Sequence, residues 1–151
     1  MGGTSFDLTL IRNGVPEITT DMDIAYSIPL RVPLIDIHTI GAGGGSIARV
    51  NDGGLLEVGP DSAGAYPGPV SYGRGGSQPT VTDANVLLGR INAEAITGAG
   101  AADRAHVVAC MEESIGRPLG LDAEHCAAAI LAVANNQMSN AARMISVEKG
   151  H

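Results

Sequence analysis

The chain has 151 residues, which is the size of one domain, and apolar residues make up 44% of it, enough to build a hydrophobic core. Its net charge of −7 and its lack of a basic stripe argue against nucleic-acid and membrane partners, because nothing in it would neutralise phosphate groups. Both cysteines fall in Ala-rich helical patterns, and neither a signal peptide nor an apolar run near 18 residues is present, so we expect a cytoplasmic protein.

The N-terminus is a loop of small residues that leads into a strand. Over residues 6–11 apolar side chains largely alternate with polar ones, which is the period of a β-strand. Asn13 and Gly14 both tolerate a positive φ, which favours a type I′ turn and a returning strand over residues 16–20. The loop could present N–H and hydroxyl donors to an anion, although any flexible terminus can have this composition. Its residues are Gly2, Gly3, Thr4 and Ser5.

Residues 21–40 are predicted to be extended. Pro29 and Pro33 exclude a helix interior over this segment. Its second half is typical of a buried strand because of the apolar residues Leu34, Ile35, Ile37 and Ile40. Asp36 and His38 are two positions apart, so on a strand they would share one face.

A glycine loop follows this strand. Without a Cβ, its backbone can take a positive φ and approach another segment closely, and such loops can line up N–H groups. A simple tight turn is the alternative. The residues of the glycine loop are Gly41, Gly43, Gly44, Gly45 and Ser46. Beyond it, the turn residues 51–54 between two apolar runs predict a β-hairpin over residues 47–58.

Residues 59–80 form a long irregular segment rich in glycine and proline. A loop longer than about 15 residues in a compact domain is usually functional or disordered. We predict an ordered loop that carries function. Tyr72 and Arg74 could reach a carboxylate or carbonyl of a substrate, and a structural role for the loop is the alternative.

The last part of the chain is predicted to be helical. A first helix begins with Thr82 as its N-cap and has Asp83 in its first turn, where the helix dipole favours a negative charge. Asp83 joins Asp36 and His38 as a candidate for polarising a substrate or holding a metal. Residues 93–100 are predicted to be a loop.

Two further helices follow. One covers residues 101–115 and ends at Gly116 and Pro118, and the last begins with Asp122 as its N-cap. The chain thus divides into a strand-rich part (1–58), the Gly/Pro loop (59–80) and a helical part (82–149). This order predicts one α+β domain, or part of a layered α/β domain.

Four segments in this order and spacing resemble the hydantoinase A/5-oxoprolinase/acetone carboxylase family. They are GGTSFD at residues 2–7, IGAGGGSIA at 40–48, VGPDSAGAYPGP at 58–69 and YGRGGSQPTVTDAN at 72–85. That family is similar to the actin/sugar-kinase/Hsp70 superfamily of ATPases. The resemblance therefore implies that the α+β fold is part of an actin-like or Hsp70-like ATPase domain.

The resemblance implies chemistry driven by ATP and Mg²⁺. Family members open a cyclic amide or imide of the hydantoin or 5-oxoproline type, or carboxylate a ketone. An amide is a poor electrophile until its oxygen is phosphorylated, and phosphoryl transfer depends on positioning and on charge stabilisation by Mg²⁺ and N–H donors. On the same resemblance residues 2–7 correspond to the second phosphate loop of the superfamily, with Gly2, Gly3 and Thr4 at the phosphate.

The other nucleotide loops of the superfamily have no counterpart in the sequence, so the resemblance implies an interior fragment of a longer polypeptide. We expect such a fragment to be inactive alone. Its partners would be the rest of the polypeptide, a hydantoinase B-type subunit and a small-molecule substrate. Apolar surface left uncovered would also favour a homo-oligomer or aggregation.

Three functional hypotheses remain open on the sequence. The first is part of a cyclic amide hydrolase, the second is part of a ketone carboxylase, and the third is an interaction or anion-binding module without catalysis. A transition metal held by Asp36 and His38 would suit oxygen and nitrogen ligands. However, two ligands on one strand do not complete a site, and an ordinary strand histidine is the alternative.

Overall fold

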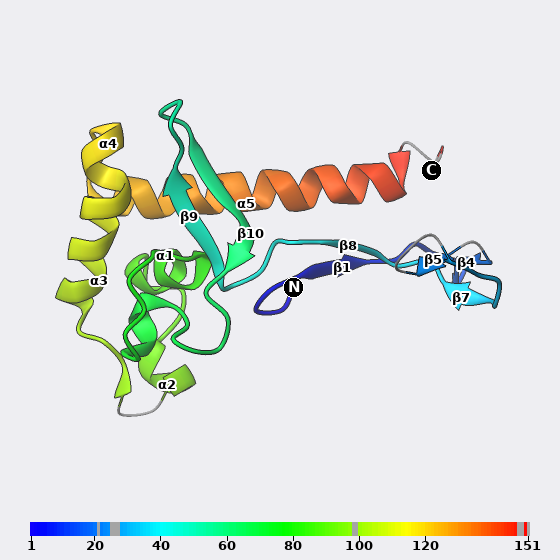
Figure 1. The fold of residues 1–151 in the computed structure, drawn as a ribbon, viewed down its shortest axis with the longest axis horizontal. Coiled ribbons are helices and arrows are strands. Elements are labelled where there is room, and N and C mark those ends of the chain that lie inside the picture. The colour runs from blue at the N-terminus through cyan, green and yellow to red at the C-terminus, as the bar shows by residue number, and fades with distance from the viewer. Residues whose placement is uncertain (21, 25–27, 98–99, 148–149, 151) are drawn as a thin grey trace.

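A computed structural model describes the backbone of residues 1–20, 22–24, 28–97, 100–147 and 150. Three predictions lie partly outside the described residues. They are the extended segment 21–40 at residues 21 and 25–27, the loop 93–100 at residues 98–99, and the helical part 82–149 at residues 148–149. Within the described residues the predicted α+β order is confirmed, with β-hairpins in the N-terminal half and helices in the C-terminal half (Figure 1).

The described residues between 6 and 40 form an extended segment, which we call the arm, built from separate two-stranded pairs (Figure 1). At its base β1 (Phe6–Leu8) pairs antiparallel with β8 (His38–Ile40). The predicted Asn13-Gly14 turn is confirmed, since both residues have a positive φ, 51° and 78°. The remaining pairs are β2 (Ile11–Arg12) with β3 (Val15–Pro16), β4 (Ile18–Thr19) with β7 (Leu34–Ile35), and β5 (Met22–Ile24) with β6 (Ile28–Leu30).

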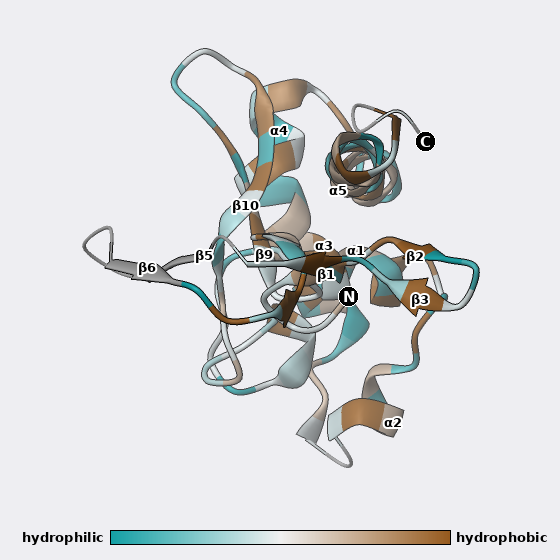
Figure 2. Ribbon diagram, turned by 90° about the vertical axis from the view of Figure 1, so that its right-hand side faces the viewer, coloured by the Kyte–Doolittle hydropathy of each residue, from teal (hydrophilic) through white to brown (hydrophobic). Residues whose placement is uncertain are grey.

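The prediction of a buried strand over residues 34–40 is wrong. Ile35 is 48% exposed and Ile37 is 57% exposed. The reason is that a two-stranded ribbon has no third layer to cover its faces. Figure 2 shows the hydrophobic colour on β1, β2 and β3, where Ile11 and Val15 are also exposed.

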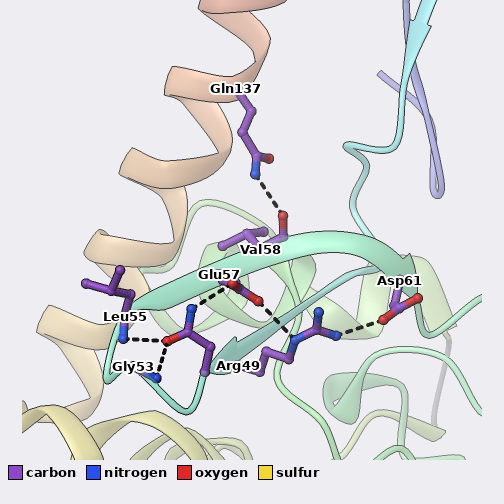
Figure 3. Close-up of polar contacts among 8 residues, drawn as sticks. Arg49, Gly53, Leu55, Glu57, Val58, Asp61 and Gln137 are labelled. Carbon is purple, nitrogen blue, oxygen red and sulfur yellow. Dashed lines mark hydrogen bonds and ion pairs between the residues drawn. The ribbon is translucent and has the colours of Figure 1, made fainter.

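A second hairpin, formed by β9 (Ser46–Val50) and β10 (Leu56–Ser62), confirms the predicted hairpin. Its turn is closed by Asn51, whose Oδ1 accepts hydrogen bonds from the N–H groups of Gly53 and Leu55. The same amide donates to Glu57, which lowers the pKa of that carboxyl, with a further contribution from Arg49. Arg49 pairs with Glu57 and Asp61 across the strands (Figure 3).

Helices make up the second half of the chain. The core lies where α5 (Ala123–Ile145) packs against α1 (Val81–Leu87), α3 (Arg104–Met111) and the β9–β10 hairpin. Its largest fully buried side chains include Met111, Ile115 and Ile130. In the described part of the chain no helix is long and apolar enough to cross a membrane. Within the described residues the structure has the helices η2 (Val70–Tyr72), α1 (Val81–Leu87), α2 (Ala93–Thr97), α3 (Arg104–Met111), η4 (Glu112–Gly116), α4 (Arg117–Leu119) and α5 (Ala123–Ile145).

Two predictions about the helical part are corrected. Helix α2 lies in the segment that was expected to be a loop, residues 93–100. The helix expected to stop at Gly116 instead continues through the π-turn η4 into α4 and ends where Gly120 takes a φ of 68°. Pro118 is the second residue of α4, directly after η4, so it lies in the final turn of this continuous helix. The predicted N-cap at Asp122 is confirmed by its bond from His125 N–H, 2.8 Å long.

One amide side chain ties α5 to the hairpin. Gln137 Nε2 donates to the carbonyl of Val58 over 2.9 Å, and Val58 itself is only 3% exposed (Figure 3). The neighbouring amides Asn135, Asn136 and Asn140 are exposed. Gln137 therefore has a structural partner, while the amides around it form a solvated face.

Replacing Gln137 with leucine is expected to lower the free energy of unfolding by about 1–3 kcal/mol. The substitution keeps the approximate volume but leaves a buried carbonyl without its donor. Asn136→Leu on the same helix is the matched control and should stay within about 0.5 kcal/mol of the parent protein. Urea denaturation of both variants measures the difference, and equal effects would show that the bond to Val58 contributes nothing.

Candidate functional site

Two glycine-rich loops lie against each other at the base of the arm. The N–H of Gly44 donates to the carbonyl of Gly2 over 2.9 Å, and the N–H of Gly45 donates to Gly3 over 2.7 Å. A Cβ on Gly43 would lie 2.5 Å from the carbonyl oxygen of Gly3. The glycine loop therefore serves close backbone approach, because no side chain fits between the two segments.

The glycine loop is also held by a hydrogen bond within the loop and by one from helix α1. Ser46 is buried, and its hydroxyl accepts a hydrogen bond from the N–H of Gly43 over 2.9 Å. On the other side, the N–H of Thr82 donates to the carbonyl of Gly44 over 2.8 Å. Gly41 is exposed and packs near Pro60.

The N-cap of α1 is Thr80, so the predicted cap at Thr82 is wrong. Thr80 and Asp83 form a capping box, in which each side chain bonds to the backbone N–H of the other residue. The cap moves by two residues because the carboxylate three positions after Thr80 completes this reciprocal pair. Thr82 lies inside the first turn instead.

Asp83 is fully buried, and its carboxylate accepts hydrogen bonds from the groups around it. It accepts hydrogen bonds from the N–H groups of Val70, Ser71 and Thr80 and from the Thr80 hydroxyl, at 2.7–3.2 Å. These bonds attach the Gly/Pro segment to the start of α1. The geometry thus gives Asp83 a structural role, and its catalytic role stays a prediction.

A cavity of about 400 Å³, here called the glycine cavity, opens between these segments. It brings together residues that the sequence singled out separately, in the N-terminal loop, the glycine loop and the Gly/Pro segment. Its lining consists of Gly3, Thr4, Gly44, Gly45, Gly64, Ala65, Pro69, Tyr72, Arg74, Thr82, Ile96 and Thr97.

Arg74 is the one charged side chain among the described residues that line this cavity. Its guanidinium lies over the Tyr72 ring, 5.7 Å from the ring centre, and donates to the carbonyl of Ala65 over 3.4 Å. In the N-terminal loop, the N–H groups of Gly3 and Thr4 have no acceptor within the described residues. A wall with free N–H donors, one cation and no carboxylate favours an anionic ligand.

Several predicted site residues lie outside the glycine cavity. Asp36 follows β7, with its N–H bonded to the carbonyl of Glu17, and His38 is in β8 opposite Leu8. Within the described ranges no three His, Cys, Asp or Glu side chains form a group that could hold a metal ion. The roles of Asp36 and His38 therefore stay predictions, and we derive no step through a transition metal.

Other members of the predicted set do not line the glycine cavity. They are Gly2, Ser5, Gly41, Gly43 and Ser46. The sequence reasoning missed Thr82, Ile96 and Thr97 as lining residues. For Thr82 a signal existed, since the spacing Thr80-x-x-Asp83 is that of a capping box and leaves Thr82 without a capping role.

A second, larger groove of about 720 Å³ lies on the other side of the glycine loop. Gly41 and Ala42 line this groove, whereas Gly44 and Gly45 line the glycine cavity. Its other walls are β10 and the face of α5 that carries Gln137 and Asn140. Different residues of the glycine loop thus line two separate hollows.

Comparison with known proteins identifies the family. The profile described as hydantoinase/oxoprolinase matches residues 1–151. Caprolactamase subunit alpha from Pseudomonas jessenii is 45% identical over 153 residues, covering 100% of this chain and 22% of that protein. The crystal structure of the ATP-dependent caprolactamase from that organism is 44% identical, with a TM-score of 0.88 over 100% of this chain and 22% of the other.

The nucleotide-free structure of acetone carboxylase, described under the mechanism of ATP-dependent acetone carboxylation, is 34% identical. Its TM-score is 0.87, covering 100% of this chain and 21% of that one. The chain therefore spans about a fifth of the length of these relatives. With a family profile that matches from end to end, the chain belongs to the hydantoinase/oxoprolinase family.

Proposed function

We propose that this chain is part of an ATP-dependent hydrolase that opens a cyclic amide, of the lactam, hydantoin or 5-oxoproline type. The observation that carries the proposal is the glycine cavity, with free N–H groups of Gly3 and Thr4 and the cation of Arg74 in its wall. The identity of 45% to a caprolactamase subunit supports the substrate class.

The cavity's own residues suit binding and orientation of a phosphate group. Free backbone N–H groups and a guanidinium stabilise the charge on phosphoryl oxygens, and a fixed backbone does so without reorganisation during the reaction. ATP, when bound with Mg²⁺, would supply the phosphoryl group that activates the amide oxygen. The described lining holds no carboxylate, so we assign no Mg²⁺ ligand within it.

A second candidate is part of an ATP-dependent ketone carboxylase. It is supported by the likeness to acetone carboxylase, with a TM-score of 0.87. The chemistry at the cavity would be the same, since an enolate oxygen would take the phosphoryl group in place of an amide oxygen. The lower identity of 34% places this candidate second. An anion-binding module without catalysis is the third.

We further propose that the chain works within an assembly that includes a hydantoinase B-type subunit. A matching relative is itself named as a subunit, the alpha subunit of caprolactamase. The arm supports association, because Ile35 and Ile37 are half exposed and exposed apolar side chains of this size favour contacts with another surface.

The test is an assay of the intact enzyme with its partner subunit. Caprolactam, 5-oxoproline and hydantoin are each supplied with ATP and Mg²⁺, and acetone with bicarbonate. We expect release of ADP and ring-opened product with a cyclic amide, and none with acetone. Turnover of acetone alone would favour the carboxylase, and nucleotide binding without turnover of any substrate would favour the binding module.

The 151-residue chain assayed alone serves as the comparison. We expect no ATP turnover above background, because the glycine cavity by itself offers one charged side chain to the nucleotide. Turnover by the isolated chain would contradict this expectation.

A further inference from the structure

Thr82 carries a hydroxyl that the fold leaves unused. The residue is 7% exposed and lines the glycine cavity. Its N–H is bonded to Gly44, but its hydroxyl has no hydrogen-bond partner among the residues that the structure describes. Among the described residues the buried side-chain oxygen without a partner is Ser71 Oγ, so the Thr82 hydroxyl still has accessible surface and can be reached by a ligand.

The nearby Thr80, in contrast, uses its hydroxyl fully. Thr80 Oγ1 donates to Asp83 over 2.8 Å and accepts from its N–H, so its bonding capacity is used. Threonine inside a helix commonly bonds the carbonyl three or four residues earlier. For Thr82 those positions lie before α1 begins, and no such bond is formed.

Gly44 lies directly beside this hydroxyl. A Cβ at position 44 would be 2.9 Å from Thr82 Oγ1, which is closer than side chains approach. Both residues line the glycine cavity, so the absence of a side chain at Gly44 leaves the hydroxyl uncovered on that side.

The surroundings decide what kind of ligand atom the hydroxyl meets. Thr82 shares the cavity wall with Gly3, Thr4 and Arg74, which offer donors and a positive charge. A hydroxyl in such a wall acts as a further donor, and an anionic oxygen is the acceptor that all of these groups suit.

We propose that Thr82 contacts the ligand in the glycine cavity by donating a hydrogen bond from its hydroxyl to an oxygen of a phosphoryl group. This inference rests on the proposed function, because that function places the phosphate chain of ATP in this cavity. It adds a side-chain donor to the backbone donors. It also gives Gly44 a role, because the absence of a side chain there leaves the Thr82 hydroxyl uncovered.

The experiment compares Thr82→Val and Thr82→Ser in the intact enzyme, with Thr9→Val as the control. Thr9 is exposed and lies outside the cavity. Isothermal titration measures binding of ATP with Mg²⁺ and of inorganic triphosphate. We expect Thr82→Val to weaken both about 10- to 100-fold, which is the range for a hydrogen bond to a charged group. Thr82→Ser should stay within about threefold of the parent protein, and Thr9→Val should have no effect.

Thermal unfolding distinguishes a binding role from a structural one. Because the hydroxyl makes no internal bond, Thr82→Val should unfold at the same temperature as the parent protein without ligand. If the parent enzyme binds ATP and Thr82→Val binds it equally well, the role of Thr82 is overturned and the proposed function stands. If the parent enzyme binds neither ATP nor triphosphate, the proposed function fails and this inference fails with it.

Discussion

Replacing Gly43 with alanine is expected to reduce ATP-dependent turnover about 100-fold, because a misplacement of roughly 1 Å at a reacting centre has an effect of this size. The added Cβ would lie 2.5–2.6 Å from Gly3 and Thr4, and the atoms that it meets are all backbone. No side chain can turn away to relieve the collision. The N-terminal loop must move, and with it the N–H groups of Gly3 and Thr4, two residues that line the glycine cavity.

The matched control for this variant is Gly100→Ala. Gly100 is exposed, and a Cβ there would meet nothing within 4 Å. We expect Gly100→Ala to keep full turnover. The rate of ADP release with saturating cyclic amide measures both variants, and a Gly43→Ala enzyme with normal turnover would mean that the contact between the two glycine loops is not needed for activity.

Replacing Asp83 with alanine is expected to lower the free energy of unfolding by about 3–5 kcal/mol, among the largest effects of any single change in this chain. The carboxylate is 0% exposed and accepts from three backbone N–H groups and one hydroxyl. Each buried donor left without an acceptor costs about 1–3 kcal/mol, and part of this cost is recovered when water enters.

Asp103→Ala provides the comparison, because it removes an aspartate that caps a helix at the surface. Asp103 is the exposed N-cap of α3 and accepts one bond, from Ala105 N–H at 3.3 Å. Its loss should cost about 1 kcal/mol, the usual value for a cap. Urea denaturation measures both. Equal costs at the two positions would show that the network around Asp83 stabilises no more than an ordinary cap.

Local turn chemistry made parts of the fold predictable from the sequence. Asn13 with Gly14, and the turn at residues 51–54, require conformations that few other residues adopt, so both hairpins could be placed in advance. The pairing of β1 with β8 could not, because it joins segments about thirty residues apart and depends on how the intervening chain folds back. The exposure of Ile35 and Ile37 was missed for a related reason, since apolar composition does not reveal whether a third layer exists.

The candidate site was predictable in its glycines and less so in its side chains. Gly3, Thr4, Gly44, Gly45, Tyr72 and Arg74 were singled out separately and line one cavity. Thr82 was wrongly predicted to be the N-cap of α1. Two threonines precede Asp83, and only the capping-box spacing shows that Thr80 is the cap. Ile96 and Thr97 were missed because α2 falls in a segment whose composition is typical of a loop.

The glycine cavity has a consequence for how rigid the protein is in each state. Its walls come from residues 3–4, 44–45 and 64–97, which are far apart in the sequence and are held together by a few backbone hydrogen bonds, such as the one from Thr82 N–H to Gly44. A ligand that bonds to all three at once would act as a non-covalent cross-link between them. At a concentration 100 times its dissociation constant, such a ligand would add about 2.7 kcal/mol to stability. Occupancy would therefore tighten the base of the arm, and proteolysis there should slow when the cavity is filled.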